Sequence, residues 1–69
     1  MYLLKIKGAG KLPDYVQVRG EDFKLIAFIN LSGIERGLIK NNLEPYSAQI
    51  IKRLSEVDFN EIIHINEEN

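Results

Sequence analysis

The feature that most constrains the fold is Phe23–Leu31, the most apolar run in the sequence. Successive side chains of a β-strand point to opposite faces of its sheet. One alternate set of this run is apolar from Phe23 to Leu31, and the other is polar at its ends, Lys24 and Asn30, but apolar in its middle. A strand with one solvated face usually alternates cleanly between apolar and polar residues. We therefore expect the central strand of a small sheet.

Two segments before this run, Tyr2–Lys7 and Tyr15–Arg19, alternate in the same way and predict two further strands. Residues 8–14 are rich in glycine and contain a proline, so they predict a loop between these strands. The three strands are close in sequence and predict an antiparallel meander.

The hairpin turn at Gly20–Asp22 leaves two registers open. An even loop puts the two valines of the second strand on the same face as Leu25 and Ala27, whereas a three-residue loop puts them on the opposite face. We prefer the even loop because it gives one coherent apolar face, although it places Arg19 opposite Lys24.

Two helices and a last strand follow. Ser32 and Glu35 have the spacing of a capping box, which predicts a short helix over about residues 33–40. A second helix over residues 45–57 carries an apolar stripe at helical spacing. Residues 61–66 predict a strand.

The order of elements is therefore β-β-β-α-α-β, which predicts a two-layer α+β fold with both helices on one face of the sheet. The neighbour of the last strand is not specified. The 69 residues are expected to form one small domain, and the hydrophobic content of 45% and charged content of 28% are typical of a globular chain. Residues 67–69 are expected to be a frayed tail.

Composition excludes several classes of protein. The chain has no cysteine, so it has neither disulfides nor thiolate metal sites, and small domains without such links often depend on oligomerisation. A net charge of −1 gives no general attraction to nucleic acid or to membranes. No apolar segment approaches the ~20 residues of a membrane helix. We expect a cytoplasmic protein without a membrane partner.

No motif predicts catalysis. The glycine-rich segment Gly8–Lys11 lacks the spacing and the following helix of a phosphate loop. His64 is the only histidine and has neither further metal ligands nor a catalytic triad at a recognisable spacing. The remaining carboxylates lie in or beside predicted turns. The short first helix and the net negative charge of the whole chain argue against a DNA-binding helix–turn–helix. We therefore expect no catalytic residue, metal or cofactor.

The face of the sheet without helices is the most informative feature. We expect the helices to cover Tyr2, Leu4 and Ile6 of the first strand, which leaves Leu3 on the opposite side. The expected partner-binding residues of that opposite side are three at its centre and four basic residues around them: Tyr15, Ile26, Phe28, Lys5, Lys7, Arg19 and Lys24.

Leaving Ile26 and Phe28 in water forgoes roughly 3–6 kcal/mol, which is comparable with the stability of a small domain. A second copy of the chain could cover this face, or pair with a sheet edge, in a symmetric homodimer. The alternatives are another protein, single-stranded nucleic acid stacked on Tyr15 and Phe28, or the chain's own loop at residues 8–14. Aromatic residues with arginine are typical of protein interfaces, so we predict a non-enzymatic protein-interaction or regulatory module.

Overall fold

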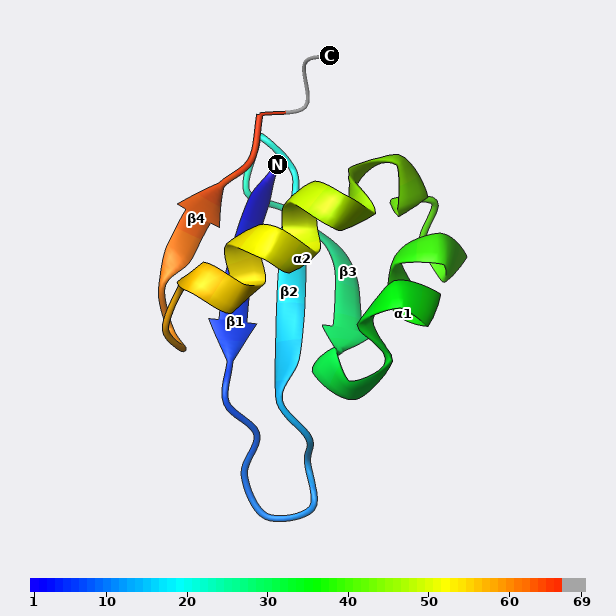
Figure 1. Cartoon of the computed structure of the whole chain (residues 1–69). Coiled ribbons are helices and arrows are strands. Elements are labelled where there is room, and N and C mark those ends of the chain that lie inside the picture. Colours follow the sequence, from blue (N-terminus) through cyan, green and yellow to red (C-terminus); the bar gives the residue numbers. More distant parts are fainter. Residues whose placement is uncertain (67–69) are drawn as a thin grey trace.

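The computed structural model describes residues 1–66, which form four strands and two α-helices, each helix preceded by a short 3₁₀ turn (Figure 1). In chain order the elements are β1 (Tyr2–Ile6), β2 (Tyr15–Arg19), β3 (Leu25–Asn30), η1 (Leu31–Gly33), α1 (Ile34–Lys40), η2 (Glu44–Tyr46), α2 (Ser47–Glu56) and β4 (Ile62–His64). The predicted α+β order β-β-β-α-α-β is confirmed. The predicted tail at residues 67–69 lies outside the described residues.

The strand order is β3-β2-β1-β4, and every neighbouring pair is antiparallel. The prediction that Phe23–Leu31 forms the central strand is therefore wrong, because β4 pairs with β1 and leaves β3 at an edge. The apolar residues on both sides of β3 do not reflect a central position. One side faces the helices, and the other belongs to the uncovered face of the sheet.

Lys5 explains why the last strand joins β1. Its ammonium donates to the carbonyl oxygens of Leu54 and Val57, at 2.9 and 3.2 Å, which holds the end of α2 over β1. The carbonyl oxygen of Lys5 accepts a hydrogen bond from the N–H of Asn60 at 2.6 Å. The connection that follows α2 therefore arrives beside β1, where β4 pairs.

The turn between β2 and β3 differs from the preferred register. Gly20 N–H donates to Lys24 O, and Phe23 N–H donates to Gly20 O, so the loop has three residues rather than an even number. A bulge near Arg19 then leaves Ile26 without an opposite residue. Together the two one-residue shifts move the register by two residues, so their effects on the facing of the side chains cancel. The even-loop prediction was wrong, yet its assignment of faces holds for most of β3.

The register shows this cancellation directly. Val16 lies opposite Ile29 and Val18 lies opposite Ala27, and all four are buried on one face. Arg19 lies opposite Leu25, so the like-charge pair expected of an even loop does not form.

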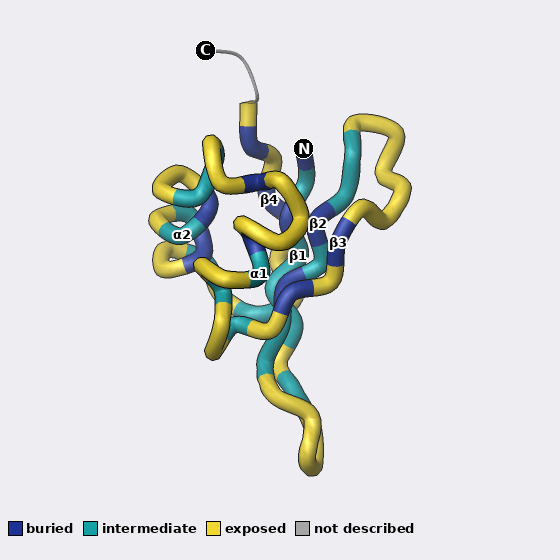
Figure 2. Tube along the Cα trace, turned by 90° about the vertical axis from the view of Figure 1, so that its right-hand side faces the viewer, coloured by how far each residue is buried: buried dark blue, intermediate teal, exposed yellow. Residues whose placement is uncertain are grey.

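Both helices pack on this one face, as predicted, and the core lies between the two layers (Figure 2). The buried residues that form the core are Met1, Leu3, Val16, Val18, Ala27, Ile29, Leu38, Leu43, Ile50, Leu54, Ile63 and Ile65. α2 contributes its apolar stripe and α1 contributes Leu38. A Cβ added to Gly37 of α1 would overlap the side chain of Ile29, so α1 packs closely on β3.

The predicted capping box is not formed. Leu31–Gly33 make a 3₁₀ turn, and the side chain of Asn30 caps it by accepting a hydrogen bond from Ser32 N–H at 2.9 Å. α1 therefore begins at Ile34, and its own N-cap has no side-chain hydrogen bond.

The predicted orientation of β1 is also wrong. Leu3 lies opposite Val18 and Ile63 and is fully buried under the helices, with 0% of its surface exposed. Cross-strand neighbours share a face, so Tyr2 and Leu4 point to the uncovered side. The sequence could not decide this, because both alternate sets of β1 begin with apolar residues.

Candidate functional site

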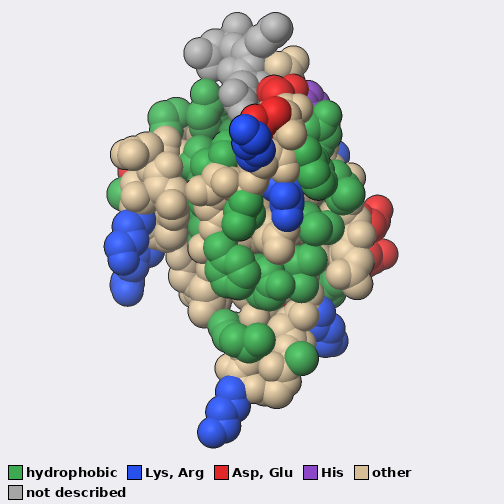
Figure 3. Space-filling view, turned by 180° about the vertical axis from the view of Figure 1, so that it is seen from behind, with side chains coloured by type: hydrophobic (Ala, Val, Ile, Leu, Met, Phe, Trp, Pro, Cys, Tyr) green, Lys and Arg blue, Asp and Glu red, His purple; other side chains and the backbone are tan. Residues whose placement is uncertain are grey.

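The candidate site is the side of the sheet that points away from the helices, which we call the open face. The cross-strand register arranges its side chains in three rows: His64–Tyr2–Arg19–Leu25, then Ile62–Leu4–Gln17–Phe28, then Ile6–Tyr15–Asn30. The unpaired bulge residue Ile26 follows Leu25 on the edge strand β3 and is 52% exposed, so it adds apolar surface at the β3 edge of this face. Seen from behind the sheet, apolar side chains gather over these strands (Figure 3).

The open face is apolar and exposed. Four of the seven large hydrophobic side chains exposed within residues 1–66 belong to it, and Phe28 at 59% and Ile26 at 52% lie on the edge strand β3. Within the three rows, Arg19 is the one residue whose side chain is always charged. Large exposed apolar surfaces are typical of interaction sites, and this makes the open face the candidate site.

Two aromatic rings are already paired on this face. The rings of Tyr15 and Phe28 stack with their centroids 4.1 Å apart and their planes inclined by 22°. They belong to neighbouring strands and sit diagonally in the ladder, within the reach of aromatic side chains. The stack fixes both rings before any partner arrives, so less side-chain entropy is lost when the surface is covered.

Arg19 is held flat against the face. Its guanidinium donates to Gln17 Oε1, with the shorter contact at 2.9 Å, and to the carbonyl oxygen of Phe23 at 2.9 Å. The guanidinium also lies 4.8 Å from the centre of the Phe23 ring. Arg19 therefore ties the middle of β2 to the hairpin that follows it.

Phe23 has a positive φ of 66°, a conformation that favours glycine. A residue in this conformation is usual in a three-residue hairpin, but a bulky side chain there costs roughly 1–2 kcal/mol. The ring makes an edge contact with Tyr2, with the centroids 5.5 Å apart, and packs under Arg19. These contacts offset the backbone strain and bend the hairpin toward the open face, away from the helices (Figure 2).

Glu21, at the tip of this hairpin, bridges to the opposite edge of the sheet. Its carboxylate contacts His64 Nε2 at 3.0 Å and the α-ammonium of Met1. Hydrogen bonds from the α-ammonium, and then from His64, lower the pKa of the Glu21 carboxyl below its ordinary value. We call this group of contacts the Glu21 bridge. Sequence reasoning missed it, since 43 residues separate Glu21 from His64.

The predicted site residues divide into two groups. Tyr15, Phe28 and Arg19 come together on the open face, Ile26 lies at the bulge on its β3 edge, and Lys24 lies on the adjoining hairpin, 4.0 Å from Asp22.

Lys5 and Lys7 lie elsewhere. The ammonium of Lys5 bonds to the end of α2, and both lysines lie over the Phe59 ring, at 4.8 and 5.8 Å from its centre. Their expected place around the open face followed from the wrong orientation of β1. The members of the face that sequence reasoning missed are Tyr2, Leu4, Ile6, Leu25 and Ile62.

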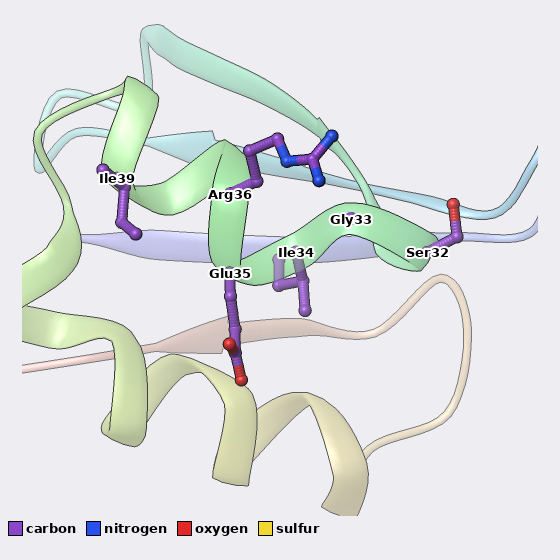
Figure 4. Close-up of a pocket in the computed structure, with 6 residues that line it drawn as sticks. All are labelled: Ser32, Gly33, Ile34, Glu35, Arg36 and Ile39. Atoms are coloured by element: carbon purple, nitrogen blue, oxygen red, sulfur yellow. The ribbon is translucent and has the colours of Figure 1, made fainter.

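The helix layer carries a shallow hollow of about 770 Å³ around α1, lined by Ser32, Gly33, Ile34, Glu35, Arg36 and Ile39. Glu35 and Arg36 point in opposite directions across it (Figure 4). A ligand site normally has polar groups that converge on the bound molecule. The two charged side chains of the hollow therefore do not converge on one point.

Within residues 1–66, no group of three or more His, Cys, Asp or Glu side chains is placed to hold a metal ion. In the same part of the chain, no helix is long and apolar enough to cross a membrane.

Comparisons with models of protein families, with curated proteins and with solved structures found no match to this chain. The open face itself therefore carries the functional argument.

Proposed function

We propose that the chain is a cytoplasmic, non-enzymatic interaction or regulatory module that binds a protein through the open face. The partner is a second copy of the chain or another protein. One observation carries the proposal: Phe28, stacked on Tyr15, remains 59% exposed in the middle row of an apolar four-stranded surface. Rigid aromatic side chains flanked by an arginine are the residues that contribute most to binding at protein interfaces.

The cost of leaving this surface in water supports the proposal. Burial of apolar area contributes about 25 cal/mol per Å², so covering the exposed halves of Leu25, Ile26, Phe28 and Ile62 releases several kcal/mol. The total stability of an ordinary domain is about 5–15 kcal/mol. A partner on this face therefore changes the stability of the chain by a substantial fraction.

The chain's own loop does not supply this cover. Residues 7–14 extend beyond the end of the sheet rather than folding back over it (Figure 1). Leu12 in that loop is itself 67% exposed.

Nucleic acid is the alternative partner for the same face, because bases stack on aromatic rings. The positions of the basic residues favour a protein instead. Lys5 bonds to the carbonyls at the end of α2, Lys7 lies over Phe59, and the guanidinium of Arg19 is held by Gln17 and Phe23. Of the four expected basic residues, Lys24 is left to meet phosphates, and it lies beside Asp22.

Affinity purification from native cells, with and without nuclease, tests the proposal. The wild-type chain is compared with Phe28→Asp and with Ile39→Asp, a matched control because Ile39 is 55% exposed on the helix layer. We expect proteins that survive nuclease treatment to be retained by the wild type and by Ile39→Asp but lost with Phe28→Asp. Capture that disappears with nuclease, or that falls steeply with salt, would support the nucleic-acid alternative. Equal capture by all three variants would refute a role for the open face.

A further inference from the structure

We infer that the partner is a second copy of this chain, packed open face to open face with the strands of the two sheets antiparallel. This inference rests on the proposed function of the open face. The twofold axis crosses the strands along the middle row, Ile62–Leu4–Gln17–Phe28, so that each of these residues lies opposite its own copy.

The area of the face suits a stable dimer. A large apolar side chain presents on the order of 150–250 Å², so each half-exposed one offers roughly 100 Å². Five such side chains lie on the face and its hairpin: Phe23, Leu25, Ile26, Phe28 and Ile62. These five side chains alone offer roughly 500 Å², and the partly exposed residues of β1 and β2 add to that area, toward the roughly 800 Å² per partner of a standard protein interface.

The rows are complementary when the second sheet is reversed. The first row of one copy then lies over the third row of the other, so Arg19 faces the second copy's Tyr15 and Tyr2 faces the second copy's Ile6. A guanidinium over an aromatic ring is an attractive contact. Because the two Arg19 residues lie at opposite ends of the interface, their positive charges do not meet.

The charges at the two ends of the sheet favour the same orientation. Glu21 and Asp22 lie at the tip of the β2–β3 hairpin, with side chains 63% and 62% exposed, and they outnumber Lys24, which lies 4.0 Å from Asp22, while the α-ammonium of Met1 contacts Glu21. Lys11 lies in the exposed loop at the other end of the sheet. Reversed sheets bring each acidic tip toward the lysine of the other copy. An axis parallel to the strands would instead bring the two acidic tips to the same end.

Pairing through the free edge of β3 is the competing arrangement. Antiparallel pairing of two β3 strands would join the sheets side by side. It would leave the middle of the open face, including Leu4 and Tyr15, in water. Edge pairing therefore does not account for the exposed apolar face, whereas face-to-face packing does.

Single cysteines distinguish these arrangements, because the chain has none of its own. Packed sheets lie about 10 Å apart, which exceeds the reach of a disulfide, so a thiol crosslinker of about that length is used. Ile62→Cys lies opposite its own copy in the face-to-face dimer and is expected to crosslink. In an edge dimer the two β4 strands are separated by seven strand spacings, about 34 Å.

Leu25→Cys is the matched control, because Leu25 is similarly exposed on the same face but lies opposite a different residue of the second copy. We expect no crosslink from it. Light scattering is expected to show a mass that rises with concentration toward twice 7.9 kDa. Phe28→Asp is expected to weaken this association by roughly 30-fold or more, while Ile39→Asp leaves it unchanged.

The outcomes separate the inference from the proposed function. A chain that stays monomeric at millimolar concentration overturns the inference. The proposed function then still stands if Phe28→Asp abolishes nuclease-resistant capture of another protein. A dimer in which Ile62→Cys fails to crosslink overturns the face-to-face packing in favour of another arrangement. Both ideas fail if the chain is monomeric and Phe28→Asp changes no capture.

Discussion

The two faces of this sheet are both apolar but are built from different side chains. The covered face uses compact aliphatic residues, such as Val16, Val18 and Ile29, which are buried against the helices. The open face mixes aliphatic residues and phenylalanine with tyrosine, glutamine and arginine, and these last three combine apolar area with a polar end. Aliphatic side chains suit permanent close packing, whereas amphipathic ones tolerate both water and a partner. The amphipathic side chains among its aliphatic residues therefore distinguish the open face from the core.

Neighbouring leucines of β1 test this distinction with the largest expected effect. Leu3 is fully buried in the core, and Leu4 is half-buried on the open face. We expect Leu3→Ala to lower the free energy of unfolding by about 2–5 kcal/mol, because a cavity remains under the helices. Leu4→Ala is expected to cost about 1 kcal/mol. Urea denaturation at low protein concentration measures both, since association there adds little to stability.

If Leu4→Ala lowers the free energy of unfolding more than Leu3→Ala does, Leu4 rather than Leu3 points to the helices, and the assignment of the two faces of β1 is wrong. If Leu3→Ala does not fold, the volume-conserving Leu3→Met, expected to cost less than about 1.5 kcal/mol, keeps the comparison measurable.

Much of the fold could be predicted from local pattern. Alternation marked the first three strands, and the apolar stripe marked α2. The assignment of faces was correct for β2 and for β3 from Ala27 onward only because two one-residue shifts add to an even number, and it was wrong for Leu25, which lies on the open face. The three-residue loop and the bulge at Ile26 each shift the register by one residue.

The candidate site was less predictable, for reasons of distance along the chain. Tyr15, Ile26 and Phe28 were identified because they lie within the segments whose alternation is visible. The side chains of β1 could not be assigned to the two faces from the sequence, because their facing depends on pairing with β2 rather than on local pattern. The Glu21 bridge depends on residues brought together by the whole sheet, and the sequence carries no signal of it.

Gly37 tests how closely the helix layer covers β3. A methyl group at Gly37 would overlap the side chain of Ile29, whereas one at Gly33 would meet open space. Gly37→Ala is therefore expected to lower the free energy of unfolding by about 1–3 kcal/mol through overpacking. Gly33→Ala is the control and is expected to stay within about 0.5 kcal/mol of the wild type. Thermal or urea unfolding decides between them, and equal stability of the two variants would mean that α1 does not rest on Ile29.

The Glu21 bridge gives the smallest expected effect, because the carboxylate is exposed and solvent screens its contacts. Its pKa is lower in the folded chain than in the unfolded chain, so the ionised form stabilises the fold. This contribution is fully present above the unfolded pKa and is lost as the pH falls through the folded pKa. Glu21→Gln has no ionisable carboxyl at this position. The free energy of unfolding of this variant is therefore expected to fall less steeply than that of the wild type as the pH is lowered.

An NMR titration of the Glu21 carboxyl carbon tests the cause of the lowered pKa. The α-ammonium of Met1 is the larger cause and His64 is the next, so acetylation of the amino terminus should raise the pKa of Glu21 more than His64→Gln does. A pKa of Glu21 that neither change moves would mean that the hairpin is not held to β1 and β4 in solution. The hairpin would then be free to leave the edge of the open face, and the acidic tip would no longer have a fixed place beside a partner.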